Sequence, residues 1–339
     1  MGFSSQSGSL GFRTQSVKGT YSNPGSGGIF MRTKSGAMGG ARDLLIPDAE
    51  IGSGRDVADA YLGPIKFEGQ YEFYARLDSL ATVLKGALGQ ASSTSTGSGD
   101  SLVGTHVITP IDGANLPWIS VEENIADGYE HFRYTDARVG SFHLEAESNG
   151  YLMGNCQLVA LSQIAVPGAS ATANPSVDTG PMIVGSNITV SFGGVQLPGK
   201  SFSIDVNNNQ ETDDFRLGSL FLGDTTPKRR EVTAQVAMRP DDSAMWRQAM
   251  YGTPNATSAG GQVTKDDFEI VCETYEFIGN TATVYSLTIT APQVILKPFE
   301  VTPSGDDVLQ HDVEIQFLRP SVAQPLLTAT IVNHLSSVK

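Results

Sequence analysis

Residues 77–89 read LDSLATVLKGALG, and this stretch decides the fold because it differs in period from the segments around it. Its apolar side chains recur at steps of three and four residues, the spacing of one helix face, and they are Leu77, Leu80, Leu84, Ala87 and Leu88. Asp78 or Ser79 can cap the start of this helix, and Gly89 stands where a left-handed C-terminal cap belongs. Most other apolar segments alternate every second residue, which is typical of half-buried strands.

The same pattern occurs a second time. A strand-like segment at 232–238 leads into a helix expected to begin near Pro240 or Asp241 and to end at Gly252. The apolar face of this second helix consists of Met245, Trp246, Ala249 and Met250. The terminating glycines, Gly89 and Gly252, are 163 residues apart. Strand patterns also correspond after each helix, at 114–148 and 265–293 and then at 151–161 and 311–318. We infer a domain that occurs twice, as a repeat of pattern.

The predicted fold class is therefore mainly β, with two tandem antiparallel β-sandwich domains, each with one flanking α-helix, and an extended N-terminal arm. A Gly/Ser-rich arm at 1–29 and a Pro/Gly-containing linker at 167–182 set the boundaries. The predicted domains span 30–166 and 183–332, and 333–339 form a C-terminal tail. Residues 90–101, QASSTSTGSGDS, are expected to form a flexible surface loop.

Composition excludes several classes of protein. The net charge is −14, from 36 acidic and 22 basic side chains, which argues against a nucleic-acid-binding surface with its basic face. Two cysteines and five scattered histidines cannot supply a disulfide framework or a zinc site. No apolar run approaches the ~20 residues of a membrane helix, and the first twelve residues do not resemble a signal peptide. We expect synthesis in the cytoplasm and no membrane partner.

Motifs of catalysis are missing from the sequence. It contains no phosphate-binding loop, dinucleotide fingerprint, GxSxG elbow or HExxH pair. Glu145 and Glu147 are two residues apart on one strand face. This spacing fits paired catalytic acids, and it also fits carboxylates on a solvated strand face. We predict no enzyme activity and no cofactor or metal. A hydrolase with an unrecognised site stays open as an alternative.

Several phrases in order, PWISVEE, DARVGSFHLE and SFSIDVNNNQ, resemble the major tail tube protein of long-tailed, non-contractile bacteriophages. The resemblance covers most of 30–332, and the internal repeat matches members with two tube domains. It implies a structural virion protein, located in the tail and made in the host cytoplasm, that polymerises into stacked rings forming a conduit for genome ejection. Implied partners are further copies of the chain and the tape measure, tail-tip and terminator proteins. DNA would pass through the lumen without specific binding.

Two similar domains per chain predict a trimeric ring with pseudo-sixfold symmetry, because three chains then supply six positions. Residues expected to line its lumen alternate with core residues on their strands, and they are Glu68, Glu72, Glu145, Glu147 and Glu314. Two long loops correspond in the two halves, at 47–61 and 205–216, and the second is expected at contacts between subunits or rings. Within the second loop, Glu211, Asp213 and Asp214 would meet Lys228, Arg229 and Arg230 of a neighbour. The alternative is a β-sandwich surface or decoration protein that binds a glycan or a host protein.

Overall fold

The structure is a computed structural model that describes residues 4–48, 50–52, 56–57, 59–113, 116–126, 129–166, 172, 175–301, 305 and 308–339. Parts of three predicted segments lie outside these residues, namely 1–3 of the arm, 49, 53–55 and 58 of the loop 47–61, and 167–171, 173 and 174 of the linker. The predicted fold class is confirmed, because the chain is mainly antiparallel β with two α-helices among the described residues.

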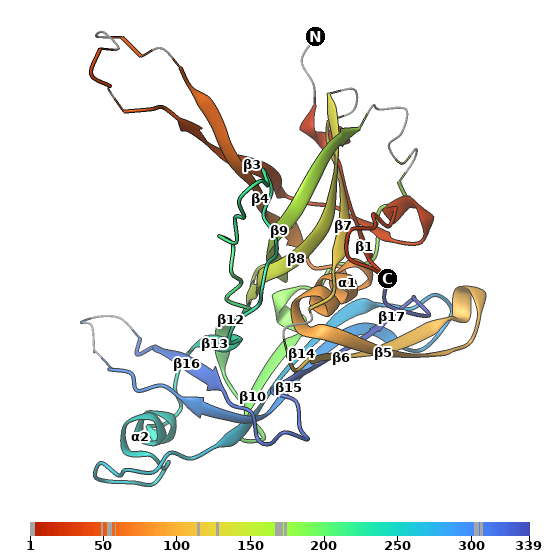
Figure 1. Cartoon of the computed structure of the whole chain (residues 1–339). Coiled ribbons are helices and arrows are strands. Elements are labelled where there is room, and N and C mark those ends of the chain that lie inside the picture. Colours follow the sequence, from red (N-terminus) through yellow and green to blue (C-terminus); the bar gives the residue numbers. More distant parts are fainter. Residues whose placement is uncertain are drawn as a thin grey trace.

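One antiparallel sheet runs through both halves of the chain, and we call it the shared sheet (Figure 1). In spatial order its strands are β3 (Ser35–Leu45), β4 (Tyr61–Tyr74), β9 (Met153–Val166), β8 (Glu130–Glu147), β12 (Gly199–Asn207), β13 (Glu231–Met238), β16 (His311–Phe317) and the end of β15 (Val284–Leu296). Each half contributes four strands, in the order first, second, fourth and third. The halves meet where β8 pairs with β12.

A second antiparallel sheet packs on the apolar face of the shared sheet. Its strands are, in order, β5 (Gly89–Thr96), β6 (Val103–Pro110), β17 (Thr328–Asn333), β15, β14 (Asp266–Phe277), β10 (Ile188–Phe192) and β11 (Val195–Gln196). It also crosses the boundary between the halves, because β17 of the second half pairs with β6 of the first. Three further strands, β7 (Ile119–Ala126), β1 (Ser9–Thr14) and β2 (Ile29–Met31), extend from the first part of β8.

Helix α1 (Leu77–Leu88) lies inside the molecule (Figure 1). Ten of its twelve residues are buried, and it contacts β6, β8 and β17. An almost wholly apolar helix needs cover on all sides, so it sits between layers instead of on a flank. Gly89 ends it at φ 119°, as predicted. The predicted cap at Asp78 or Ser79 is wrong, because the buried Asp178 accepts a hydrogen bond from the Ser79 N–H at 2.8 Å.

Helix α2 (Ala244–Tyr251) lies on the periphery and contacts β15. Gly252 ends it in the left-handed conformation, as the sequence predicts. Its predicted apolar face is only partly covered, since Met245 and Ala249 pack against the core while Met250 is 39% exposed. The two repeats therefore use their helices differently, one as core and one as a flank.

Two Gly/Ser-rich segments are more regular than their composition indicates. The expected loop at 90–101 is wrong for most of its length, because β5 pairs with β6 over eight residues. Within the predicted arm, β1 pairs with β7, and Leu10 and Phe12 are each 2% exposed. In both segments backbone hydrogen bonds to a neighbouring strand supply the order that the side chains do not.

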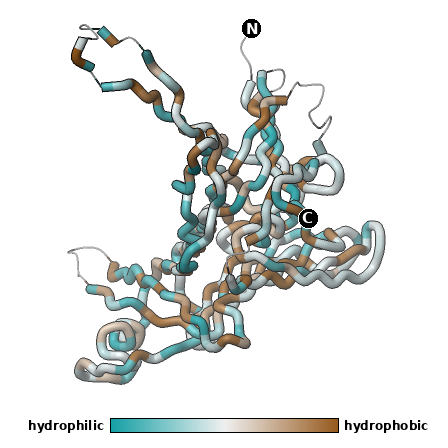
Figure 2. The backbone as a smooth tube through the Cα atoms, in the orientation of Figure 1, coloured by the Kyte–Doolittle hydropathy of each residue, from teal (hydrophilic) through white to brown (hydrophobic). Residues whose placement is uncertain are grey.

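The β3–β4 hairpin projects away from the body of the molecule (Figure 1). Hydrophobic residues recur along this projection, as the colouring of the backbone in Figure 2 shows. Several of them are more than half exposed, namely Leu44, Leu45, Ile46, Ile51, Val57, Tyr61 and Leu62. Exposed apolar residues that gather on one projection are typical of a surface covered by a partner.

Candidate functional site: the polar face of the shared sheet

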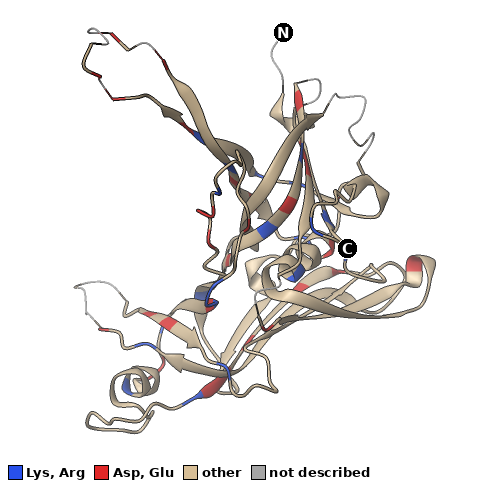
Figure 3. Cartoon of the chain, viewed as in Figure 1, with Lys and Arg blue, Asp and Glu red and all other residues tan. Residues whose placement is uncertain are grey.

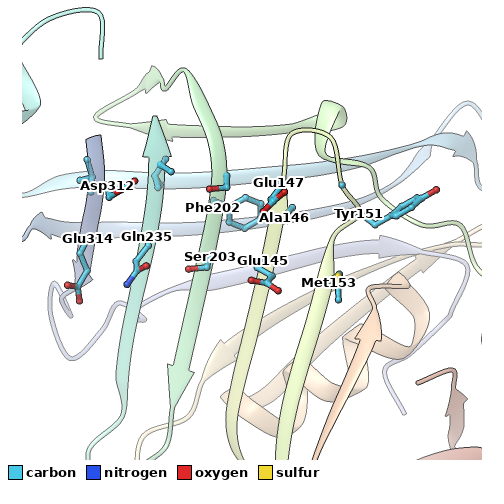
Figure 4. A pocket seen from close by; sticks show the side chains of 15 residues that line it. Glu145, Ala146, Glu147, Tyr151, Met153, Phe202, Ser203, Gln235, Asp312 and Glu314 are labelled. Atoms are coloured by element: carbon cyan, nitrogen blue, oxygen red, sulfur yellow. The ribbon is translucent and has the colours of Figure 1, made fainter. Parts of the chain in front are cut away.

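The exposed face of the shared sheet carries acidic and amide side chains in rows that cross the strands. One row consists of Glu314, Gln235, Ser203, Glu145 and Met153, which are direct neighbours in the register of five adjacent strands (Figure 4). Residues on the opposite face of the same strands, such as Val236, Ile204 and Leu144, are buried. Alternation along each strand thus separates a polar face from the core.

Two neighbouring rows extend the same face. The first contains Asp312, Ala237, Ser201 and Glu147, and the second contains Gln316, Thr233, Asp205, His143, Asn155 and Glu72. All five glutamates predicted to line a lumen therefore lie on one face of one sheet. Glu145 and Glu147 lie on β8, Glu314 lies three strands away on β16, and Glu72 lies two strands away in the other direction on β4. Glu68 lies toward the far end, beside Val159.

A few cations neutralise part of this charge. Lys297 forms an ion pair with Glu314, and Lys66 lies 3.1 Å from Glu68. His143 bridges the two halves, with its Nδ1 2.7 Å from Asp205 and its Nε2 3.3 Å from Glu145. The hydrogen bond to Asp205 raises the pKa of His143, although partial burial opposes the shift. In the part of the chain that the structure describes, Glu147 and Asp312 have no ion pair, so the face stays net acidic.

The centre of the face is concave, with a volume of about 580 Å³. Glu145, Glu147, Gln235, Asp312 and Glu314 line it from three strands, β8, β13 and β16. Within the described ranges, no group of three His, Cys, Asp or Glu side chains could hold a metal ion. Figure 3 shows charged residues dispersed over the strands that it draws, without a basic patch. An extended acidic surface of this kind repels polyanions.

The segment 208–226 covers one end of the face. Leu222 is buried against Val159 and Leu161, with Trp118 beside them. Arg138 stacks on the Trp118 ring at 3.5 Å and donates a hydrogen bond to the Leu116 carbonyl. The exposed acidic face is therefore confined to the rows nearer the junction of the two halves.

The loop residues predicted at subunit contacts already have partners within the chain. Asp214 pairs with Arg216 at 2.6 Å, and Glu211 lies 3.9 Å from Lys228. Arg230 differs from its neighbours because it is half-buried and donates to Asn208 Oδ1 at 3.1 Å and to the Ile111 carbonyl at 3.2 Å. Its donors thus hold the end of α1 within the chain. Asp213 and Arg229 are on the same surface loop region, and their role at a contact stays a prediction.

Sequence reasoning missed several members of the polar face. Asp205, Gln235 and Asp312 alternate with buried residues just as the named glutamates do, and so does His143, whose place between Phe142 and Leu144 already indicated that it points away from the core. Alternation in SFSIDV and HDVEIQF would have identified Asp205 and Asp312 by the same argument. Arg138 and Glu123 carry no such signal, because both are buried charges whose partners lie far away in the sequence, such as Thr225 for Arg138 and Tyr71 for Glu123.

Comparison with known families gives one match. A family model described as phage tail tube protein matches residues 5–316. No curated protein matches the chain. Among the helices described, neither has the length and apolarity needed to cross a bilayer.

Proposed function

The chain belongs to the phage tail tube protein family, whose members are structural components of the virion tail. From this membership we propose that it polymerises into stacked trimeric rings that form a conduit for genome ejection. The observation that carries the proposal is the shared sheet, whose one face is core and whose other face is acidic over both halves. A closed ring of such sheets turns the acidic face toward an enclosed passage and removes exposed strand edges.

The dimensions of a trimeric ring suit duplex DNA. Eight strands per chain give about 24 strands in three chains, and at ~4.8 Å spacing and ~40° tilt the barrel has a backbone diameter of roughly 48 Å. Side chains of about 5 Å on each wall leave a bore of roughly 38 Å. A duplex roughly 20 Å wide would clear the wall by ~9 Å, which is close to one Debye length in physiological salt. Weak repulsion then discourages adhesion of the DNA without blocking passage.

We assign the lumen wall to the polar face, including Glu68, Glu72, Glu145, Glu147 and Glu314. The projecting β3–β4 hairpin, with its exposed apolar residues, supports a role in contacts between stacked rings. The loop that carries Glu211, Asp213 and Asp214, together with Lys228 and Arg229, is proposed at contacts between subunits. Further partners are the tape measure, tail-tip and terminator proteins, and DNA passes without specific binding.

Negative-stain imaging of the purified protein tests the assembly, because rings and tubes are recognisable directly. The lumen assignment is tested with Glu145→Lys/Glu147→Lys in assembled virions. The matched control is Glu273→Lys/Glu276→Lys, which makes the same charge change on exposed residues of β14. We expect slower release of DNA for the first variant only, and more so at low ionic strength, where charges act over longer distances. Equal rates of DNA release for the two variants would contradict the assignment of the polar face to the lumen wall.

A further inference from the structure

The β8–β12 junction joins the two halves through a defined register. Seven residue pairs run from Ser201–Glu147 to Asn207–Ser141. It places the last strand of one four-strand unit against the first strand of the next unit. If units repeat around a ring, the same kind of junction is needed between the last strand of one chain and the first strand of the following chain.

Equivalent positions in the two units follow from the helix-ending glycines and the strand registers. Tyr71 of β4 corresponds to Ala234 of β13, 163 residues later, and their partners on the preceding strand are Gly36 and Ile204. Met38 of β3 is therefore equivalent to Val206 of β12.

The other side of each unit is matched in the same way. Ile315 of β16 corresponds to Cys156 of β9, and their partners on the third strand are Leu296 and Phe142. Because Val206 faces Phe142 in the junction, the equivalent pair is Met38 and Leu296.

Neither of the two equivalent edges pairs with a further strand among the residues described. Among the residues described, β3 pairs with β4 alone, and no strand pairs with the outer side of residues 295–301. The β14 pairing of β15 stops at Val294, just as the β7 pairing of β8 stops at Ala137 before β12 takes over. An unpaired strand edge is a template for pairing with another chain. Pro298 has no N–H and would face outward on this edge, so backbone pairing is limited to residues 295–297.

On both edges, the residue of the proposed pair is the one whose backbone N–H and C=O groups point outward, away from its own sheet. Lys297 donates its N–H to Glu314 of β16, so the backbone groups of the alternate residue Leu296 point outward. On β3 the groups of Met38 point away from β4, because its carbonyl accepts from Tyr134 Oη and its N–H lies 3.4 Å from the Glu123 carboxylate. These side chains satisfy the edge in the single chain, and the carbonyl can accept a second donor.

Side-chain chemistry fits this register. Met38 and Leu296 are 3% and 4% exposed, so their pairing continues the apolar layer across the junction. Ala37 would face Lys297 and leave space for its long side chain. Lys34 and Glu300, both exposed, would lie opposite each other with complementary charge.

We propose that residues 37–39 of β3 pair antiparallel with residues 295–297 of a second copy of this chain, in the register that sets Met38 opposite Leu296. This inference rests on the proposed ring. It makes the contact between chains a copy of the β8–β12 contact within each chain.

Cysteine crosslinking tests the register in assembled protein. Ala37→Cys/Lys297→Cys places two thiols directly opposite in a pair that lacks mutual hydrogen bonds, where Cα atoms are ~4.5 Å apart. The positive control, Asp205→Cys/His143→Cys, occupies the equivalent pair within one chain. The out-of-register control, Ser35→Cys/Ile295→Cys, is displaced by four residues, or about 13 Å. Native Cys156 and Cys272 are fully buried and do not compete.

We expect the in-register variant, assembled under reducing conditions and then treated with a short thiol–thiol crosslinker, to give dimers and trimers on a denaturing gel. Mixing chains with only one of the two cysteines should give dimers, which covers the case in which the double variant assembles poorly. Tubes in which only the out-of-register pair crosslinks would overturn the register and leave the proposed function intact. Absence of rings and tubes from the wild-type protein would instead overturn the proposed function.

A charge exchange provides a second measurement. Lys34→Glu is expected to slow ring formation at low salt, and adding Glu300→Lys should restore it. Failure of the second substitution to restore assembly, in a chain whose wild type forms rings, would also contradict the register.

Discussion

Asp78 and Asp178 lie at the first turn of α1 in contrasting environments, so replacing each by asparagine should have opposite effects. The Asp178 carboxylate accepts hydrogen bonds from the N–H groups of Ser79 and Gly180, each at 2.8 Å. Asp78 has a buried Oδ1 without a hydrogen-bond partner. Burial and, next, the charge of Asp178 raise the pKa of Asp78 from 3.8 to about 6.

The raised pKa of Asp78 determines the sign and the size of the change in stability expected for Asp78→Asn. A carboxyl group that binds its proton more tightly in the folded state destabilises the fold when ionised, fully above pH 6 and not at all below its unfolded pKa. The change from 3.8 to about 6 corresponds to about 3 kcal/mol at high pH. The helix N-terminus favours a negative charge by up to ~1 kcal/mol. Asp78→Asn should therefore raise the free energy of unfolding by about 1–3 kcal/mol at pH 8 and leave it nearly unchanged at pH 4.

Asp178→Asn is the matched comparison. It weakens a charged cap that bonds two backbone N–H groups, and a loss of about 1–2 kcal/mol at pH 8 is expected. Urea denaturation of dilute protein at pH 4, 6 and 8, followed by the fluorescence of Trp118 and Trp246, measures both variants. A loss of stability for Asp78→Asn at pH 8, or an equal gain at pH 4 and pH 8, would refute the reasoning.

Two further substitutions probe the junction and the end of α1. In the folded state His143 gains a partner in Asp205, which raises its pKa. Its contribution to the free energy of unfolding is therefore complete below its unfolded pKa and is lost as pH rises through the folded pKa. His143→Gln should cost under about 1 kcal/mol at pH 5.5, since the side chain is a third exposed, and less at pH 9; a loss independent of pH would contradict this. Gly89→Ala should cost about 2–4 kcal/mol in denaturation, because φ is 119° and the new Cβ would lie 2.2 Å from Ile111 Cγ2. Gly113→Ala, at φ 94° in open space, should cost about 1 kcal/mol, and equal losses would exclude the steric cause.

The two helices illustrate how far a repeat of pattern extends. Gly89 and Gly252 end α1 and α2 as predicted, because a residue with positive φ after the last turn is a local requirement, although only Gly252 adopts the left-handed conformation. Their surroundings differ completely, with α1 buried between layers and α2 on the periphery. Leu80 and Leu84 give α1 an apolar surface that only other layers can cover, whereas α2 carries the polar residues Arg247 and Gln248, and only Gln248 of this helix is buried.

The Ser/Thr-rich strand β5 shows that a segment can be regular even though its own sequence predicts a loop. Its side chains bury little, and their composition favours a loop. Eight residue pairs with β6 make it a strand, and β6 is held in turn by β17 from the far end of the chain. A sequence window of twelve residues does not contain these partner strands and so cannot predict the pairing.

The sequence alone determined what depends on local period. Alternation placed Glu145, Glu147 and Glu314 away from the core of their strands, and the glycine spacing revealed the repeat. Only the tertiary structure decided that these strands belong to one sheet and that their polar faces coincide. It also decided that Asp178, a hundred residues away, caps α1. The reason is physical: side-chain period is encoded in neighbouring residues, whereas backbone N–H and C=O groups are alike in every strand, so the choice of partner depends on how the whole core packs.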